Sequence, residues 1–582
     1  MDLLDRLYKA GVLNRVDVEF ARLLGRISKM EDEKVLLIPA LSSRAPREGE
    51  VCVDLNNINE SIQMDLDETE VDISLPSKNE ILKLIEGVEF ISEYSDKSEP
   101  TPIIREKERF YLYRYFKDEM SLAKIITKRI ENKSRLIENV DLPSIKQLTQ
   151  RDDIKGLEGI LNSSSLLLIT GGPGTGKTTL ASSIIECFIK SGIHADRIGV
   201  VAPTGRAAAR MGEVISEKLK GVSADEIRPT TIHRRFGIHP DRPFYARYDT
   251  SNPVDLDLLV MDEASMVDLV TMTRVFEGLP DDCIVIMIGD PDQLASVQAG
   301  SVLTDLCRSS SVHNKAELRL KRRFRFNESI GRCADLINGD KENSDEFINF
   351  IKSSSNSIKY DDLSKPDWMD RAIEKAYSNY SKLKEYARDG KVEDAVRILS
   401  EFRFLSALRR GRYGCEAINE RIKKRLDESK DRWFAGRVIM ITNNDTNRNL
   451  FNGDLGVVVR VGEGLRVAFP DYSKKSGDET MGVDKGKRVR FFDPYNLPAF
   501  EDAFATTIHK AQGSEADEVV LLFPPDDSPI LTREILYTGI TRAKENLTIF
   551  AKPEIIRKCI TTPIKRSSGL REKIDGLKIH SN

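Results

Sequence analysis

The sequence predicts an α/β protein built around parallel sheets. Four short apolar runs, 166–169, 198–202, 258–261 and 283–288, each end in glycine or polar residues. Such continuous apolar runs are typical of strands that are buried on both faces of a parallel sheet. Because ligands bind at the carboxyl edge of a doubly wound sheet, the polar residues after each run are the candidates for a site.

The first apolar run leads into the sequence GGPGTGKT at 171–178, and a helix-compatible stretch follows from Leu180 to Lys190. Glycines let successive backbone N–H groups face a phosphate, and the helix start adds its positive end. Lys177 supplies a charge to the β- and γ-phosphates, and Thr178 can place a hydroxyl on Mg²⁺. The strand before the loop and the helix after it argue against a chance match. The predicted nucleotide-binding residues are Gly171, Gly172, Pro173, Gly174, Thr175, Gly176, Lys177, Thr178 and Thr179.

Acidic and amide side chains follow two of the other predicted strands. Asp262 and Glu263 come directly after the run 258–261, and Gln293 follows the run 283–288. One carboxylate can hold Mg²⁺ and its neighbour can take a proton from the attacking water. Alone, such a pair is as often a solvated strand end, but the upstream phosphate loop favours the catalytic interpretation. Gln293 is placed where a sensor of the γ-phosphate would lie.

Eight sequence blocks in order resemble those of superfamily 1 helicases. The resemblance is greatest to the RecD family, the alpha subunit of bacterial exonuclease V (RecBCD), notably over 402–422 and 436–458. It implies two RecA-like motor domains and the use of ATP and Mg²⁺. The blocks are GGPGTGKTT at 171–179, APTGRAA at 202–208, TTIHRRFG at 230–237, MDEASMVD at 261–268, GDPDQLASVQAG at 289–300, FRF at 324–326, ATTIHKAQGSE at 505–515 and YTGITRAK at 537–544.

The resemblance also assigns catalytic roles. Arg325 and Arg542 match two arginine fingers contributed by the second motor domain. A guanidinium suits that role because it offers two parallel donors to phosphoryl charge and keeps its proton. A single arginine is by default a surface ion pair, and Arg325 lies in a basic run, so its assignment depends on the FRF match. The implied catalytic residues are Lys177, Glu263, Gln293, Arg325 and Arg542; the implied Mg²⁺ ligands are Thr178 and Asp262; Glu515 is assigned to the nucleotide.

Contacts to single-stranded DNA are expected from short hydroxyl, amide and basic groups in the matched blocks. Such groups suit sugar-phosphate contacts rather than the reading of base edges. A lone histidine is more often a core residue, but His233 and His509 both lie in Thr-Ile-His triplets inside matched blocks. The expected residues are Thr204, Gly205, Arg206, Thr231 and His233 in the first motor domain, and Thr507, His509, Lys510, Gln512 and Ser514 in the second.

One position departs from the family pattern. Family members carry a glutamine upstream of the phosphate loop that reads adenine, and the gap-free register places Ile154 there. Gln147 and Gln150 lie a few residues earlier, and Gln150 is the candidate. The sequence therefore supports triphosphate binding more firmly than a strict preference for ATP.

The composition is ordinary for a soluble protein of 582 residues, with 40% hydrophobic and 31% charged residues. No apolar run is long enough to span a membrane, and the charged N-terminus is unlike a signal peptide. Seven cysteines without a C-x-x-C pair predict neither a zinc module nor a disulfide framework, which fits a cytoplasmic location. A net charge of −4 alone argues against nucleic acid, but the basic clusters 321–325, 409–412 and 421–425 predict local positive strips.

The chain divides into three predicted domains. They are an N-terminal partner-docking domain of helical and mixed structure at 1–105, a first motor domain at 106–317 and a second at 318–582. Acidic residues gather from Asp65 to Glu99, a linker is expected at 95–102, and an amphipathic helix over 111–116 is expected to lead into the first motor.

Two inserts are predicted within the motors. Residues 238–253 form either a small hairpin, the strand-separating pin that the resemblance implies, or a surface loop with a packed aromatic residue. Residues 433–500 contain short alternating runs that predict a small β-barrel, of SH3-like type by resemblance.

The resemblance implies an ATP-driven helicase and translocase moving 5′ to 3′ on single-stranded DNA. Its partners would be a RecB-like nuclease-helicase and a RecC-like scaffold, acting at duplex ends in double-strand-break repair and recombination. The chain shows no nuclease carboxylate cluster of its own. One alternative is a stand-alone RecD-like helicase, which usually has a longer N-terminal region. Another is a scaffold subunit that binds nucleotide without translocating, but Glu263, Gln293, Arg325 and Arg542 argue against it.

Overall fold

A computed structural model describes most of the chain. The described residues are 2–30, 32–58, 73, 75–95, 100–145, 151, 153–219, 227–239, 241–324, 327–339, 344–354, 357–427, 431–445, 447–471 and 489–577. Two candidate site residues, Gln150 and Arg325, lie outside them, as do Gln147, the acidic run 65–72 and residues 96–99 of the predicted linker.

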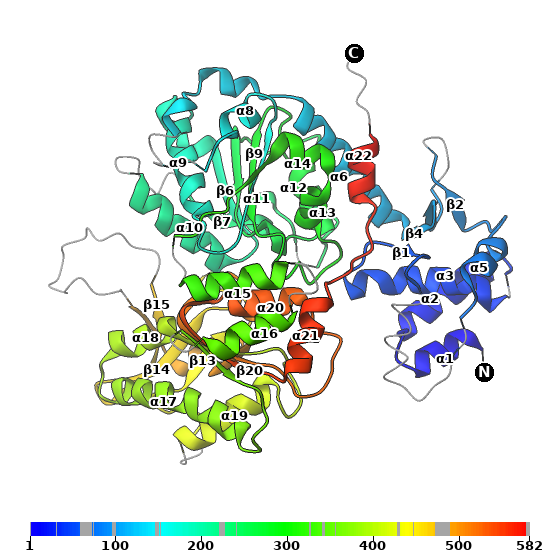
Figure 1. The fold of residues 1–582 in the computed structure, drawn as a ribbon. Helices are drawn as coiled ribbons and strands as arrows, with labels where there is room; N and C mark the ends of the chain where they lie inside the picture. The colour runs from blue at the N-terminus through cyan, green and yellow to red at the C-terminus, as the bar shows by residue number, and fades with distance from the viewer. Residues whose placement is uncertain are drawn as a thin grey trace.

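Short helices and a small sheet form the N-terminal domain (Figure 1). Helix α2 begins with a capping box in which Asn14 and Asp17 bond each other's backbone N–H groups, and the buried face of α1 carries Leu4 and Leu7. The short helices predicted here are thus confirmed. The elements are α1 (Leu3–Lys9), α2 (Arg15–Ile27), α3 (Glu33–Arg44), α5 (Lys78–Leu84) and the sheet β1-β4-β3-β2, with β1 (Val53–Asp54), β2 (Ile91–Glu93), β3 (Ile103–Glu106) and β4 (Arg109–Leu112).

The start of the helix predicted over 111–116 was wrong. Tyr111 and Leu112 belong to β4, where they pair with β3, and α6 begins only at Tyr113 and runs to Glu131. Tyr111 is fully buried, so an apolar pattern that read as the face of a helix belongs instead to a short buried strand. The N-terminal sheet therefore continues past residue 105.

The first motor lobe is a six-stranded parallel sheet in the order β10-β5-β9-β8-β6-β7. All four strands predicted from apolar runs are confirmed in it. Its last strand pairs with β5 as far as Arg319, so this sheet extends past residue 317. The strands are β5 (Leu166–Thr170), β6 (Ile198–Ala202), β7 (Thr230–Thr231), β8 (Leu258–Met261), β9 (Ile284–Gly289) and β10 (Glu317–Arg319), with helices α8 (Leu157–Leu161), α9 (Lys177–Lys190), α10 (Gly205–Lys218), α11 (Ile232–Phe236), α12 (Leu269–Glu277), α13 (Val302–Arg308) and α14 (Ser310–Ala316).

The second motor lobe is a five-stranded parallel sheet in the order β11-β20-β19-β12-β18. One face packs against α15, α16, α20 and α21, and the other packs against α17, α18 and α19. The strands are β11 (Ile358–Asp361), β12 (Phe402–Ser406), β18 (Ala505–Thr507), β19 (Ala516–Leu522) and β20 (Ala543–Phe550), and the helices are α15 (Glu328–Asn338), α16 (Ser344–Ser353), α17 (Trp368–Arg388), α18 (Val392–Glu401), α19 (Cys415–Leu426), α20 (Arg533–Ile540) and α21 (Pro553–Thr561).

The insert at 433–500 is an antiparallel sheet in the order β16-β15-β14-β13-β17, with a small core of its own around Trp433 and Phe469. Within the described residues, β16 and β17 are edge strands that do not pair with each other. A closed SH3-like barrel therefore stays a prediction. The strands are β13 (Val438–Ile441), β14 (Leu455–Val461), β15 (Gly464–Pro470), β16 (Val489–Phe492) and β17 (Phe500–Asp502).

The segment 238–253 has two isolated bridges, His239 to Arg242 and Asp249 to Asn252, and its described residues contain no strand. The ring of Phe244 packs edge-on against Tyr115 of α6 at a centroid distance of 5.6 Å. These tight turns and the packed ring are the features expected of the surface loop rather than of a hairpin.

The C-terminal segment leaves α21 on the second lobe and ends with α22 (Leu570–Gly576), which packs on α6 of the first lobe (Figure 1). No helix among the described residues has both the length and the apolar character that crossing a membrane requires.

Candidate active site

The phosphate loop connects β5 to α9, and two of its glycines are required by geometry. Gly171 has φ +148°, and a Cβ there would lie 2.5 Å from the carbonyl oxygen of Leu320. Gly176 has φ +76°, and its Cβ would lie 2.9 Å from the guanidinium of Arg151. Gly176 caps α9 without a side-chain bond, so the first N–H groups of this 14-residue helix face the loop. The loop and the helix start together form a cradle for an anion.

The side chains after the cradle reach across to the end of β8. The Lys177 ammonium donates to the carbonyl oxygens of Gly171 and Gly172, at 2.6 and 2.9 Å, and therefore lies over the loop. The Thr178 hydroxyl is 3.3 Å from the Asp262 carboxylate. A hydroxyl and a carboxylate oxygen side by side are ligands that suit Mg²⁺.

Asp262 and Glu263 follow β8 at the edge of the sheet. Glu263 has a left-handed backbone, with φ +52°, which is uncommon for a residue other than glycine and often marks functional sites. Burial raises the pKa of both carboxyls, and the neighbouring Asp262 raises that of Glu263 further. Arg542, Lys177 and Arg210 act in the opposite sense on Glu263. A carboxylate with a raised pKa is better suited to accept a proton from water.

Arg542 approaches this carboxyl from the second lobe. Its side chain is buried, with 3% of the residue exposed, and it donates to the carbonyl oxygens of Thr538 and Ser514 at 3.1 and 3.3 Å. A third, longer contact of 3.5 Å reaches the Thr541 hydroxyl. These bonds hold the guanidinium in the second lobe while its charge acts on Glu263 of the first.

A second arginine joins the two lobes and was missed by the sequence analysis. Arg210 on α10 pairs with Glu515 at 3.1 Å and donates to the Gly513 carbonyl at 3.4 Å. Burial disfavours the charged form of Glu515, but Arg210 and Arg542 outweigh it and lower its pKa. Glu515, which the resemblance assigned to the nucleotide, is thus a partner in an ion pair between the lobes. Arg210 lies one helical turn after Arg206, on the same face of α10. This spacing was the signal in the sequence that could have identified Arg210 as a site residue.

Gln293 lies on the loop after β9, at the same edge of the sheet. Its amide donates to Asp290 at 2.9 Å, and the Tyr537 hydroxyl donates to the same carboxylate at 3.0 Å. The backbone N–H of Leu294 donates to the Thr538 hydroxyl at 3.0 Å. The loop that carries Gln293 therefore contacts α20 of the second lobe directly.

An aromatic ring lies beside the phosphate loop. The backbone N–H of Phe324 donates to the Gly174 carbonyl at 2.9 Å, and half of this residue is exposed. The guanidinium carbons of Arg151 and Arg322 lie 4.9 and 5.0 Å from its ring centroid. Such a ring offers a face on which a nucleotide base can stack. Ile154, the position in gap-free register with the adenine-reading glutamine, is only 7% exposed and belongs to the core.

The residues predicted to contact DNA lie in both lobes, and several make local bonds. The hydroxyls of Thr204 and Thr231 cap α10 and α11, and the two chain segments are adjacent because β6 pairs with β7. In the second lobe, the Thr507 hydroxyl accepts from the backbone N–H of Lys510, and the Ser514 hydroxyl donates to Ala511.

The longer predicted DNA residues are also held by the protein. Lys510 pairs with Glu501 at 2.5 Å, and the Gln512 amide donates to the Leu294 carbonyl at 2.8 Å. Burial lowers the pKa of His233 and of His509, which favours their neutral forms.

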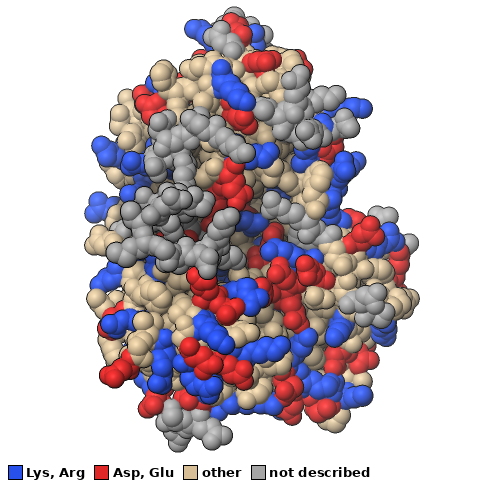
Figure 2. All heavy atoms as spheres, turned by 90° about the vertical axis from the view of Figure 1, so that its left-hand side faces the viewer, with Lys and Arg blue, Asp and Glu red and all other residues tan. Residues whose placement is uncertain are grey.

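The insert of the second lobe touches the first lobe near these residues. A Cβ on Gly205 would lie 2.5 Å from the ring of Phe451, so this glycine permits close packing. Arg206 lies close enough to Asp454 of the insert to oppose the rise in that carboxyl's pKa that burial causes. On the face shown in Figure 2, basic and acidic side chains are interspersed, and no single positive strip dominates.

Three family models match the chain. The model described as "RecBCD enzyme subunit RecD, N-terminal domain" matches residues 9–111, "AAA domain" matches residues 157–299, and "UvrD-like helicase C-terminal domain" matches residues 502–550. The matches cover the N-terminal domain, the site-bearing part of the first lobe and the end of the second.

The chain is also similar to named proteins along nearly its whole length. It is 31% identical to the RecBCD enzyme subunit RecD of Mycolicibacterium smegmatis, over 97% of this chain and 98% of that protein. It is 32% identical to the same subunit of Mycobacterium tuberculosis, over 97% of this chain and 96% of that protein. The ATP-dependent RecD2 DNA helicase of Deinococcus radiodurans is 27% identical over 65% of this chain, which corresponds to 46% of that protein.

Proposed function

On the premise that this chain belongs to the family of RecD subunits of RecBCD enzymes, we propose that it is the 5′-to-3′ motor of a three-subunit machine in the cytoplasm. The chain is an ATP-dependent DNA helicase. The observation that carries the proposal is the similarity to RecD subunits over 97% of the chain. The machine would process duplex ends in double-strand-break repair and recombination.

The cradle fits a magnesium-bound triphosphate. Lys177 and the start of α9 would bind the β- and γ-phosphates, since both present donors or positive charge to the loop. Thr178 and Asp262, 3.3 Å apart, would hold Mg²⁺, which neutralises phosphate charge when bound. Phe324 would stack on the base, with Gln150 as the candidate for reading adenine.

Hydrolysis would require both lobes. Glu263 would accept the proton of the attacking water, and Arg542 would donate to the phosphoryl oxygens from the second lobe, together with Arg325. Gln293 would report the γ-phosphate to α20, because its loop already bonds Thr538 there. This arrangement links hydrolysis to the distance between the lobes.

Single-stranded DNA would cross both lobes, contacting their short polar side chains. As the distance between the lobes changes, each of the two sets of contacts would in turn hold the DNA strand while the other moves along it. These sets are Thr204, Gly205, Arg206, Thr231 and His233 on one side, and Thr507, His509, Lys510, Gln512 and Ser514 on the other.

The N-terminal domain would dock the chain onto a RecC-like scaffold beside a RecB-like nuclease-helicase. Val16, Leu23 and Ile27 on α2 are 72%, 46% and 69% exposed, and their spacing places them on one face of the helix. Tyr8 of the preceding helix is 45% exposed. A cluster of exposed apolar residues is typical of a protein interface. The alternative of a stand-alone helicase is less well supported, since the RecD2 relative matches 65% of this chain whereas the RecD subunits match 97% of it.

The test is co-expression of this chain with the RecB-like and RecC-like subunits of the same cell. The triple change Val16→Ser, Leu23→Ser and Ile27→Ser is expected to prevent co-purification while leaving the DNA-stimulated ATPase of the isolated chain unchanged. Tyr495→Ser is the control, because Tyr495 is 80% exposed but lies on the second lobe. If the triple variant assembles as well as the control, this docking face is excluded; if the unchanged chain finds no partner, the stand-alone alternative is favoured.

A further inference from the structure

A strap formed by residues 562–577 ties the three parts of the molecule together. It begins on the second lobe, where the backbone N–H of Ile564 donates to Glu534 at 2.9 Å. It ends on the first lobe, where Leu570 and Ile574 of α22 are buried against α6. None of the residues proposed for catalysis lies on this strap.

The far end of the strap is anchored firmly. The Lys573 ammonium, with 5% of its side chain exposed, contacts Glu119 of α6 at 2.7 Å and also pairs with Glu106 of β3. It lies 4.7 Å from the ring centroid of Tyr111. A buried lysine that lost these partners would be left as an uncompensated charge, so the pairing strongly favours the docked strap.

Between its two ends, the strap contacts the loop that carries Gln293. One nitrogen of the Arg566 guanidinium donates to the carbonyl oxygens of Gln298 and Gly300, at 3.1 and 3.2 Å, and lies 3.4 Å from the Ser296 hydroxyl. These three residues form the end of the loop 290–300. Arg566 therefore binds the C-terminal end of this loop, several residues after Gln293.

The loop is compact enough to transmit a displacement. The Ser296 hydroxyl donates within the loop to the carbonyls of Gln298 and Gly300, at 2.9 and 2.8 Å. Nearer the start of the loop, the backbone N–H and carbonyl of Leu294 are both bonded by the second lobe, through Thr538 and Gln512. The loop is thus fixed at two places: Leu294 is bonded to the second lobe, and the C-terminal end of the loop is bonded to the strap.

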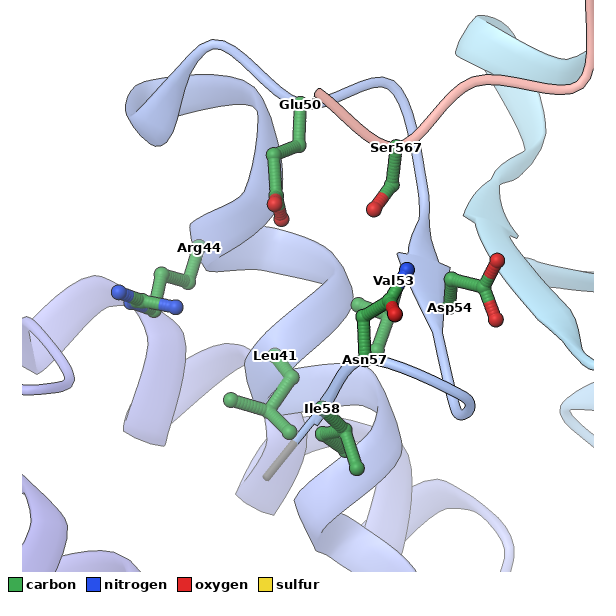
Figure 3. A pocket seen from close by; sticks show the side chains of 8 residues that line it. All are labelled: Leu41, Arg44, Glu50, Val53, Asp54, Asn57, Ile58 and Ser567. Carbon is green, nitrogen blue, oxygen red and sulfur yellow. The ribbon is translucent and has the colours of Figure 1, made fainter. Parts of the chain in front are cut away.

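The N-terminal domain completes this junction. The backbone N–H of Gly300 donates to the Gly49 carbonyl, and that of Val51 donates to the Ser567 carbonyl, both at 2.9 Å. Gly49 has φ +80°, and a Cβ there would lie 2.9 Å from the central carbon of the Arg566 guanidinium. Figure 3 shows the strap residue Ser567 passing beside Glu50 over a pocket of the N-terminal domain.

We propose that Arg566 is a positioning residue for ATP hydrolysis, through which the N-terminal domain sets the placement of the Gln293 loop. The guanidinium acts through the loop and does not touch the nucleotide. Movement of Gly49 or of the strap would shift the loop end, and with it Gln293. The docking of a protein partner on the N-terminal domain would then change the rate of hydrolysis. This inference rests on the proposed roles of Gln293 and of the N-terminal domain.

The test compares Arg566→Gln and Arg566→Lys with Arg571→Gln in the full-length chain. Arg571 is a matched control, because it lies on the same strap but is 56% exposed in its side chain, and the distance to Asp575 is 3.9 Å. Arg566→Gln is expected to lower kcat of DNA-stimulated hydrolysis about tenfold while KM for ATP changes less than about threefold. Arg566→Lys, which keeps a charge and a donor, should recover part of kcat, and Arg571→Gln should match the unchanged chain.

A second route reaches the same junction without altering the arginine. Gly49→Ala places a methyl group against the Arg566 guanidinium and is expected to lower kcat with the same split between kcat and KM. A purely structural strap would instead lower the thermal midpoint of both variants, with unchanged kcat in the folded fraction, and that result would overturn the inference. So would an Arg566→Gln chain indistinguishable from Arg571→Gln. If the unchanged chain itself showed no DNA-stimulated hydrolysis, the proposed function would fail instead.

Discussion

Replacing Arg542 by alanine removes an arginine of the second lobe whose charge acts on Glu263 while its side chain stays almost wholly buried. We expect this change to reduce turnover far more than it reduces the affinity for single-stranded DNA. The reason lies in how the guanidinium is held. It has five N–H groups, and the contacts to Thr538, Ser514 and Thr541 occupy one on each of its three nitrogens.

One N–H therefore remains on each terminal nitrogen, which matches a phosphoryl group that offers two oxygens side by side. Two charge-assisted hydrogen bonds at about 1.5–3 kcal/mol each give a loss of about 3–6 kcal/mol. About 4 kcal/mol corresponds to roughly a 10³-fold fall in turnover, the range known for arginine fingers.

The assay is steady-state ATP hydrolysis at saturating single-stranded DNA, with DNA affinity measured separately by fluorescence anisotropy. Arg542→Lys is the matched variant, because it keeps the charge but cannot offer two parallel donors. We expect it to recover only a small part of the turnover. A variant with normal turnover and weak DNA binding would move Arg542 from the nucleotide site to the DNA path and refute the reasoning.

Two further outcomes are expected. Lys177→Ala should weaken triphosphate binding, whereas Glu263→Gln should leave it largely intact and abolish hydrolysis; fluorescent nucleotide titration separates them, and equal loss of binding in both would contradict the assigned roles. Burial raises the pKa of Glu50 to about 7, so its contribution to stability is complete below about pH 4.5 and is lost as the pH rises through 7. The free energy of unfolding of Glu50→Gln, relative to that of the unchanged chain, should therefore increase by about 1–2 kcal/mol when the pH is raised from 5 to 8. Thermal midpoints at both values measure this gain, and an equal difference at the two pH values would argue against a buried, titrating Glu50.

Much of the motor core was predictable because its strands are buried on both faces. Residues 166–169, 198–202, 258–261 and 283–288 had to be apolar throughout, so each reads as a strand without an alignment. The phosphate loop was predictable for a similar reason, since its glycines are required by backbone geometry. A strand of only four residues gives no such signal, and the end of β4 was therefore taken for the start of a helix.

Side chains whose roles depend on contacts with residues far away in the sequence could not be predicted in the same way. Arg210 matters because it meets Glu515 across the lobes, and Arg566 matters because it meets the loop after β9. In the sequence, each is one arginine among 89 basic residues. Phe324 lies within a matched block, but only the folded chain places its exposed ring beside Gly174.

The charges around Glu263 explain why hydrolysis should follow the approach of the lobes. Lys177 and Arg210 act on this carboxyl from the first lobe, whereas Arg542 acts from the second. Separation of the lobes would remove Arg542 and so raise the pKa of Glu263 further, because burial and Asp262 would be opposed by fewer positive charges. It would also withdraw the donors that stabilise the transferred phosphoryl group. One movement would therefore favour the protonated form of Glu263, which cannot accept a proton, and would remove the stabilising donors at the same time. The strap that bonds both lobes is placed to control this movement.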